Sequence, residues 1–321
     1  MDKPGAKRHM SARSVPQASR PMPVAALPLP HFLLALAVVA VWGTNFVVIK
    51  YGLVELPPLA FAALRFFFAL VPAVFFLPRP KVPWGHLAAY GVLIGAGQFG
   101  LLYIAMNGQI SPGLASLVVQ VQVFFTIGLA MAATGERVRL FQVAALVLAT
   151  AGIGVILAHS DRTTTPLGLV LVILAAMGWA GGNHVAKLSG RVNMLAYVVW
   201  ASLFSVPPLV AMSLVMEGWP MVRQALGEAS PAAWAAVAWQ SVGNTLFGYA
   251  AWGWLLARHP AATITPMALL VPVFGMGASA LLLGEAMPGW KIAAASLVMA
   301  GLALNILWPI VAARRLPPPA A

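Results

Sequence analysis

Long apolar runs, separated by short segments rich in charge, proline or glycine, occupy most of this sequence. An α-helix needs about 20 mostly apolar residues to cross a bilayer, and lipid offers no water to satisfy exposed backbone groups. Because the runs have this length, we predict an all-α membrane protein with ten transmembrane helices. The predicted spans are residues 31–50, 57–78, 84–106, 113–133, 139–158, 165–186, 194–216, 232–256, 262–283 and 288–308.

The two ends of the chain differ from the apolar runs. Residues 1–30 are basic and rich in proline and serine, so we expect a disordered cytoplasmic tail there. The run that follows is too long for the hydrophobic region of a secretory signal and lacks a persuasive cleavage site. We therefore expect it to be retained as the first span. Residues 309–321 are predicted to form a second cytoplasmic tail.

Composition confirms that lipid must be the surrounding solvent. Hydrophobic residues make up 61% of the 321 residues and charged residues 8%, whereas soluble domains average roughly 45–50% and about 25%. A soluble fold cannot bury this much apolar surface. The chain contains no cysteine, which excludes disulfides, thiolate chemistry and cysteine-bound metal ions. We expect no cofactor and no metal site.

The charge distribution predicts the orientation of the chain in the membrane. The formal net charge is +12, which in a soluble protein would suggest a nucleic-acid partner. With the N-terminus inside, however, fourteen basic and two acidic residues lie on the cytoplasmic side, against five basic and five acidic residues outside. This asymmetry follows the positive-inside rule. We therefore expect an inner (plasma) membrane protein with both termini in the cytoplasm and no nucleic-acid partner; a monomer is compatible with this pattern.

The chain contains two related halves. Matching positions are Trp42 with Trp179, Asn45 with Asn183, Gln98 with Asn244, Tyr103 with Tyr249, and Gly135-Glu136 with Gly284-Glu285. Each half holds five predicted spans, and because five is odd, the second half enters the membrane from the opposite side. We predict two inverted five-helix repeats, residues 31–158 and 159–308, around a central cavity. Such repeats are typical of secondary transporters, with the substrate site near the bilayer midplane.

Several motifs together resemble a known family. They are "WGTNFVVIK" from Trp42, "LRF" from Leu64, "PGLASLVVQVQVFFT" from Pro112, "GERV" from Gly135, "WAGGN" from Trp179 and "LLVPVFG" from Leu269. This set resembles the EamA family of the drug/metabolite transporter superfamily, and within it the O-acetylserine/cysteine exporters. The resemblance implies ten helices in two inverted repeats, a central cavity and export of small amino-acid-like metabolites, with no enzyme activity.

Two asparagines within apolar runs are the strongest candidates for substrate contacts. Asn45 and Asn183 are equivalent in the two repeats, and each amide offers two donors and an acceptor. Such a side chain is costly in hydrocarbon unless it faces the bundle interior; the structural alternative is an interhelical hydrogen bond. Trp42 and Trp179 lie one turn before the asparagines, too deep for the interfacial aromatic belt, so we expect them to line the cavity.

Other polar side chains in the spans are candidates for the same cavity. Gln98 and Asn244 form a second pair, for which substrate contact and helix packing are both open. Gln120 and Gln122 point about 200° apart on a helix, so they cannot share a face. We favour Gln120 for the cavity and keep Gln122 as a candidate. Tyr249 could add an aromatic wall with one hydrogen-bond donor.

Three charged or titratable residues could gate or couple transport. Lys50 and Arg65 lie at or near span ends, where they could form an outer gate or attract an anionic group, although membrane anchoring by snorkelling side chains is favoured. His184 could titrate in a proton-coupled cycle, but a histidine in a helix is more often a hydrogen-bonded structural residue. The predicted spans contain no acidic residue. A proton relay would therefore need His184 or an acid near a mouth, such as Glu136 or Glu285.

Other classes of function fit the sequence less well. A polytopic membrane enzyme would need paired acids, a metal constellation or a nucleophile with a base, and no H-E-x-x-H, G-x-S-x-G or Walker A motif is present. A channel should show continuous polar faces, whereas the polar residues here are isolated. The expected partners are a small amino-acid-like substrate and the lipid bilayer. The main alternative is a related transporter of another cargo, such as other amino acids, drugs or lipids.

Overall fold

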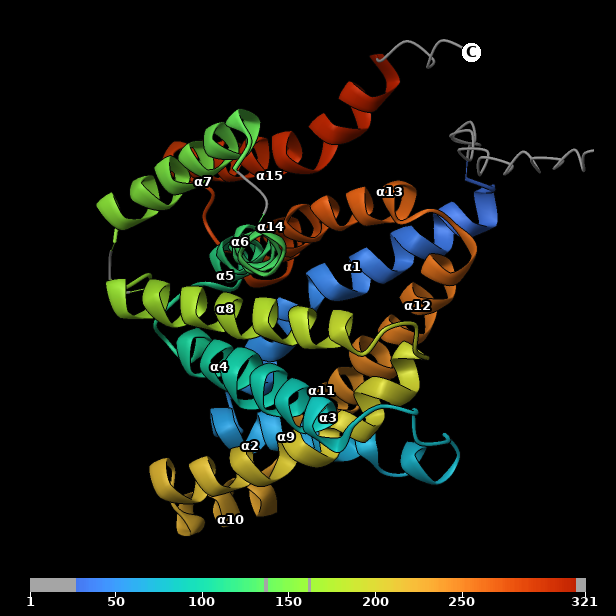
Figure 1. Cartoon of the computed structure of the whole chain (residues 1–321). Helices are drawn as coiled ribbons and strands as arrows, with labels where there is room; N and C mark the ends of the chain where they lie inside the picture. The colour runs from blue at the N-terminus through green and yellow to red at the C-terminus, as the bar shows by residue number, and fades with distance from the viewer. Residues whose placement is uncertain (1–26, 136–137, 161–162, 316–321) are drawn as a thin grey trace, which may run out of the picture.

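The computed structural model describes residues 27–135, 138–160 and 163–315, and all regular structure in these residues is helical. Most of the predicted N-terminal tail, residues 316–321 and Glu136 lie outside the described residues. The α-helices are α1 (Leu29–Gly52), α2 (Pro58–Leu70), α3 (Trp84–Val92), α4 (Leu101–Met106), α5 (Pro112–Val118), α6 (Gln122–Thr134), α7 (Leu140–Ala158), α8 (Pro166–Leu188), α9 (Met194–Met216), α10 (Trp219–Glu228), α11 (Pro231–Ala238), α12 (Gly248–Arg258), α13 (Ala261–Ile264), α14 (Leu270–Leu283) and α15 (Gly289–Arg315). Figure 1 shows their arrangement.

Tighter and wider helical turns join several of these helices into longer rods. The π-helical segments are η2 (Leu93–Gly100) and η4 (Trp239–Phe247), and the 3-10 segments are η1 (Ala73–Phe75), η3 (Val119–Val121) and η5 (Thr265–Leu269). Segment η2 connects α3 to α4, and η4 connects α11 to α12, each without a break in the chain's helical course. The predicted third and eighth spans therefore each contain a π-helical centre.

The all-α class is confirmed, and nine of the ten predicted spans have a counterpart. Nine helical segments in the described part of the chain are long and apolar enough to cross a membrane. The remaining prediction, residues 232–256, corresponds to the rod formed by α11, η4 and α12, which is not among the nine. Its centre carries four buried polar residues that lower its hydropathy: Gln240, Ser241, Asn244 and Thr245. Membrane crossing by the rod of α11, η4 and α12 stays a prediction.

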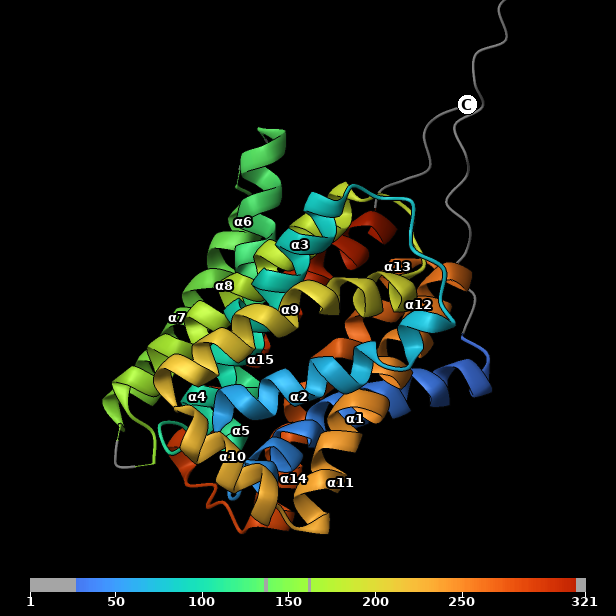
Figure 2. The ribbon, with the colours of Figure 1, turned by 90° about the horizontal axis from the view of Figure 1, so that it is seen from below.

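Contacts between helices recur in the two halves of the chain. Helix α1 packs on α14 as α8 packs on α6, and α2 packs on η4 as α9 packs on η2. Two pairs join equivalent helices directly: α2 with α9, which lie alongside each other in Figure 2, and α7 with α15, which form one edge of the bundle in Figure 1. Each contact thus has a partner contact of the kind that a two-fold relation between the halves requires.

The two π-helical segments obey the same relation. Segment η2 begins at Leu93 and η4 begins at Trp239, 146 positions later, which is also the separation of Gln98 and Asn244. A π turn widens the helix and alters the hydrogen bonding of backbone carbonyl groups, and such turns occur frequently at functional sites. The pair of polar residues found in the sequence therefore lies on the two places where regular α-helix is interrupted.

Equivalent glycines make the α7–α15 contact close. Gly152 of α7 faces α15, and a Cβ added to it would lie 2.9 Å from the carbonyl oxygen of Ala294. Gly301 of α15, 149 positions later, faces α7 in the same way, and its Cβ would lie 2.5 Å from the carbonyl oxygen of Ala145. The backbones approach because neither position carries a side chain, as small residues permit at membrane helix contacts.

We predict that Gly152→Ala destabilises the protein by about 1–3 kcal/mol, because the added methyl group would overpack the contact with α15. Gly154→Ala is the matched control, since the same helix leaves open space at Gly154 and alanine favours a helix by about 1 kcal/mol over glycine. Thermal unfolding in detergent should give a lower Tm for Gly152→Ala and an unchanged or higher Tm for Gly154→Ala. Equal Tm values would contradict the close contact.

Candidate functional site

A buried arginine lies at the centre of a polar cluster inside the bundle. Arg65 is in the middle of α2, and only 1% of it is exposed. The expectation that Arg65 lies at a span end as a membrane anchor is therefore wrong. Its side chain does not snorkel to the interface, because neighbouring helices supply hydrogen-bond acceptors that lipid lacks.

The acceptors come from η4 and α4. Arg65 Nε donates a hydrogen bond to Thr245 Oγ1 at 3.2 Å, and Arg65 Nη1 donates to Gln240 Oε1 at 3.2 Å. Nη1 also lies 3.4 Å from the hydroxyl oxygen of Tyr103, which itself donates to Gln240 Oε1 at 2.9 Å. The Ser241 hydroxyl donates to the backbone oxygen of Arg65 at 3.0 Å. These bonds fasten α2 to η4, the π-helical centre of the rod formed by α11, η4 and α12.

Helix α1 joins the cluster through two residues predicted from the sequence. Gln240 Nε2 donates to Asn45 Oδ1 at 2.7 Å, and both residues are buried. The indole nitrogen of Trp42 donates to the backbone oxygen of Asn244 at 3.2 Å. The glycine at position 248 leaves room for this indole, since a Cβ there would lie 2.4 Å from Trp42 Nε1. Asn45, Trp42 and Asn244 are thus brought together around Arg65.

Aromatic rings enclose the charged group. The guanidinium carbon of Arg65 lies 3.6 Å from the centre of the Phe99 ring, a distance suited to a cation–π contact. Tyr249 packs against Trp42 with ring centres 6.0 Å apart, and Trp252 lies on the same indole at 5.2 Å. The cluster therefore has aromatic walls and neutral oxygens around one cation.

Four members of this cluster were not singled out from the sequence. Gln240 and Thr245 accept hydrogen bonds from Arg65, Ser241 donates to its backbone oxygen, and the Phe99 ring faces its guanidinium. A signal for the first three was present. Gln240, Ser241, Asn244 and Thr245 repeat at the spacing that places residues on one side of a helix, so they mark an inward-facing polar stripe. Nothing in the pattern around Phe99 distinguishes it.

Gln98, the counterpart of Asn244, lies in η2, which is the π-helical segment of the first half of the chain. It is 4% exposed, and its Oε1 atom is enclosed without a hydrogen-bond partner among the described residues. Helix α8 approaches the backbone here, since a Cβ on Gly178 would lie 2.8 Å from the carbonyl carbon of Gly97. Gln98 therefore sits at a close helix contact and keeps an unused acceptor.

Asn183 belongs to a second, smaller polar cluster. Its Nδ2 atom donates to Gln122 Oε1 at 3.2 Å, and the Thr126 hydroxyl donates to the same oxygen at 3.1 Å. The two predicted asparagines therefore do not contact each other. Each has a glutamine partner, Gln240 for Asn45 and Gln122 for Asn183, and the partners come from different spans of the repeat.

The remaining candidates make few polar contacts. Gln120 is buried, whereas Trp179, His184 and Lys50 are half-buried. The side chains of all four make no hydrogen bond or ion pair with the described residues. Lys50 does not pair with Glu55, whose carboxylate instead accepts hydrogen bonds from the Ser230 backbone N–H and hydroxyl, both at 2.7 Å. These two hydrogen bonds, of which the backbone bond has the larger effect, hold the pKa of Glu55 below its ordinary value.

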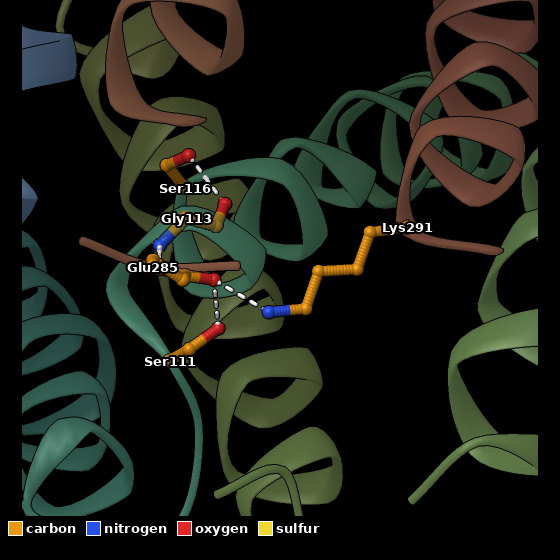
Figure 3. A network of polar contacts seen from close by, with 5 residues as sticks. All are labelled: Ser111, Gly113, Ser116, Glu285 and Lys291. Atoms are coloured by element: carbon orange, nitrogen blue, oxygen red, sulfur yellow. Dashed lines mark hydrogen bonds and ion pairs between the residues drawn. The ribbon is translucent and has the colours of Figure 1, made fainter. Parts of the chain in front are cut away.

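Two further carboxylates bind the first turns of helices. Glu217 accepts hydrogen bonds from the backbone N–H groups of Leu59 and Ala60 in α2. Glu285 accepts from the backbone N–H of Gly113 and the hydroxyl of Ser111 at the start of α5, and it forms an ion pair with Lys291 at 2.9 Å (Figure 3). This is the one ion pair within the described residues. A role of Glu285 in proton coupling would require it to leave these partners.

These features define an integral membrane transporter: membrane-length helices in two related halves, with polar clusters enclosed between them. The described residues contain no group of three or more His, Cys, Asp or Glu side chains that could hold a metal ion. The model of the EamA-like transporter family matches the chain twice, over residues 29–158 and 166–307. The chain belongs to the EamA-like transporter family, within the drug/metabolite transporter superfamily, and is therefore a transporter rather than an enzyme.

Similar proteins cover most of the chain. A protein of Salmonella typhimurium named "Probable amino-acid metabolite efflux pump" is 40% identical over 279 residues, which are 85% of this chain and 93% of that protein. A protein of the same name from Escherichia coli K12 is 39% identical over 85% of this chain and 94% of its own length. A solved crystal structure has a TM-score of 0.60 at 18% identity, covering 89% of this chain and 98% of that chain; this likeness concerns the fold alone.

Proposed function

We propose that this protein exports small amino-acid-like metabolites from the cytoplasm by alternating access, with cysteine and O-acetylserine as the first candidate cargoes. The observation that carries the cargo class is the similarity to two probable amino-acid metabolite efflux pumps along almost their whole length. The motifs that resemble O-acetylserine/cysteine exporters narrow the class further.

The chemistry of the polar clusters supports the same class. An amino acid is a zwitterion, so its binding site needs hydrogen-bond donors and acceptors for both of its charged groups. Asn45 and Gln240 supply amide groups beside Arg65, and Asn183 and Gln122 supply amide groups in the second cluster. We propose that both asparagines contact substrate during the transport cycle, Trp42 and Tyr249 forming apolar walls. Gln98, with its unused acceptor, is a further candidate.

The orientation of the chain is also part of this proposal. The excess of basic residues on one side supports cytoplasmic termini in the inner membrane. Inner-membrane transporters are found among the similar proteins; one from Escherichia coli K12 is named as such and is 27% identical over 52% of this chain. In this orientation the ion pair of Glu285 and Lys291 lies on the outer side.

Single introduced cysteines should report this orientation directly, because the natural chain has none. Lys81 and Asn107 are exposed residues in the loops before α3 and after α4. We predict that a membrane-impermeant maleimide labels Asn107→Cys in intact cells and labels Lys81→Cys only after permeabilisation. The opposite pattern would reverse the proposed orientation.

We predict that cells producing the wild type release labelled cysteine or O-acetylserine faster than cells without the protein. Asn45→Ala and Asn183→Ala should each lower export per protein molecule by about tenfold, the factor that corresponds to roughly 1.4 kcal/mol of lost interaction. Asn107→Ala, a loop asparagine outside both clusters, is the matched control and should export normally. Membrane abundance is measured for every variant.

Each outcome of this assay has a distinct meaning. Export by the wild type together with loss in well-folded asparagine variants would support both the cargo and the site. Variants that lose abundance but keep the wild-type rate per molecule would contradict a role of the asparagines in substrate contact. A wild type that releases neither compound would remove this cargo and direct the search to other amino acids, drugs and lipids.

A further inference from the structure

The charge of Arg65 is not balanced by any acid in the described part of the chain. Four acidic residues are described, and each is engaged elsewhere. Glu55 binds Ser230, Glu217 binds the first turn of α2, Glu228 accepts from Gln224, and Glu285 pairs with Lys291. A buried cation without a carboxylate is costly to maintain in a membrane protein, and an ionisable residue kept at such a position usually marks a substrate or ion pathway.

The hydrogen bonds of Arg65 leave part of the guanidinium unused. A guanidinium has five N–H donors. Nε and Nη1 donate to Thr245, Gln240 and Tyr103, but Nη2 makes no hydrogen bond with any described residue. All of the acceptors present are neutral oxygens, which bind a cation less strongly than a carboxylate does. The group is therefore held in place but retains the capacity to bind an anion.

The surroundings of the guanidinium also restrict its orientation. Its carbon lies 3.6 Å from the centre of the Phe99 ring, so the ring supports one side of it. Thr245 and Gln240 hold Nε and Nη1 from η4. A planar guanidinium fixed in this way suits the two-pronged hydrogen bonding of a carboxylate. The corresponding helix of the second repeat, α9, carries no charged residue over Met194–Met216. The second repeat therefore has no equivalent of Arg65 on this helix.

We propose that Arg65 binds the carboxylate group of the transported metabolite, which would displace the neutral oxygens from the guanidinium. This inference rests on the proposed function, because it requires an amino-acid-like cargo. The ammonium group and side chain of the cargo then face the amides and aromatic rings around Asn45 and Trp42. Since Arg65 is 1% exposed, the contact between α2 and η4 has to open before the carboxylate enters.

The test compares cysteine with cysteamine, which has the same thiol and ammonium groups but no carboxylate. Purified protein in nanodiscs is used, and the absence of cysteine from the chain prevents disulfide formation with these thiols. We expect the wild type to bind cysteine at least about tenfold more tightly than cysteamine. Arg65→Gln should bind cysteine as weakly as cysteamine, and its affinity for cysteamine should be that of the wild type.

Two variants separate charge from structure. Arg65→Lys keeps the charge without the two-pronged geometry and should retain part of the preference for cysteine. Arg79→Gln is the matched control, because Arg79 also lies over an aromatic ring, 4.0 Å from the centre of Trp84, but is in the loop before α3. It should keep the full preference. If Arg65→Gln lowers the affinity for cysteine and for cysteamine equally, or lowers neither, Arg65 is structural and the inference is overturned.

Failure of the cargo assignment is distinguished by the same measurement. If the wild type binds neither cysteine nor O-acetylserine, other pairs of an amino acid and its decarboxylated amine are compared, such as histidine with histamine and phenylalanine with phenethylamine. A carboxylate preference that disappears in Arg65→Gln supports the inference with a different cargo. A wild type with no carboxylate preference in any pair overturns it.

Discussion

A guanidinium enclosed by apolar helices needs hydrogen-bond acceptors, and much of this structure follows from supplying them to Arg65. Gln240 and Thr245 provide the acceptors from η4, and Tyr103 supports them from α4. The Trp42 indole donates to the backbone oxygen of Asn244 in the same π-helical segment. These contacts fasten α1, α2 and α4 to the centre of the rod formed by α11, η4 and α12. The low hydropathy of that rod is a consequence, because the polar side chains that serve Arg65 must be built into it.

The two halves share their packing but not their chemistry. The contacts α1–α14 and α8–α6, the π segments η2 and η4, and the glycines at 152 and 301 all follow the two-fold relation. The arginine breaks it. In α9, the counterpart of α2, no residue is charged, and the buried Ser205 donates to the carbonyl of Gly91. A repeat that is symmetric in its backbone and asymmetric in its polar groups allows rocking between two similar conformations while holding one chemically asymmetric cargo, as the proposed function requires.

Sequence patterns predicted the helices and part of the cluster, for identifiable reasons. Runs of apolar residues report span length directly, and the pairs Asn45 with Asn183 and Gln98 with Asn244 were visible as repeats. The position of Arg65 was misjudged because its partners lie 175 and 180 residues away in the chain, so nothing local to "LRF" showed that protein rather than lipid surrounds it. The bond between Asn183 and Gln122 was hidden for a similar reason, since it spans 61 residues. Hydrophobic periodicity does not reveal the π turns. The equivalent residues Gln98 and Asn244, 146 positions apart, lie within them.

The central claim is that the cargo binds at the Arg65 cluster, between the π-helical centres of the two halves. A crystal structure of the protein with cysteine bound would test it most directly. The account predicts the cysteine carboxylate at hydrogen-bonding distance, about 3 Å, from the Arg65 guanidinium, with the Arg65–Thr245 or Arg65–Gln240 bond lengthened or broken. Cysteine bound beside Asn183 and Gln122, with every contact of Arg65 unchanged, would contradict it.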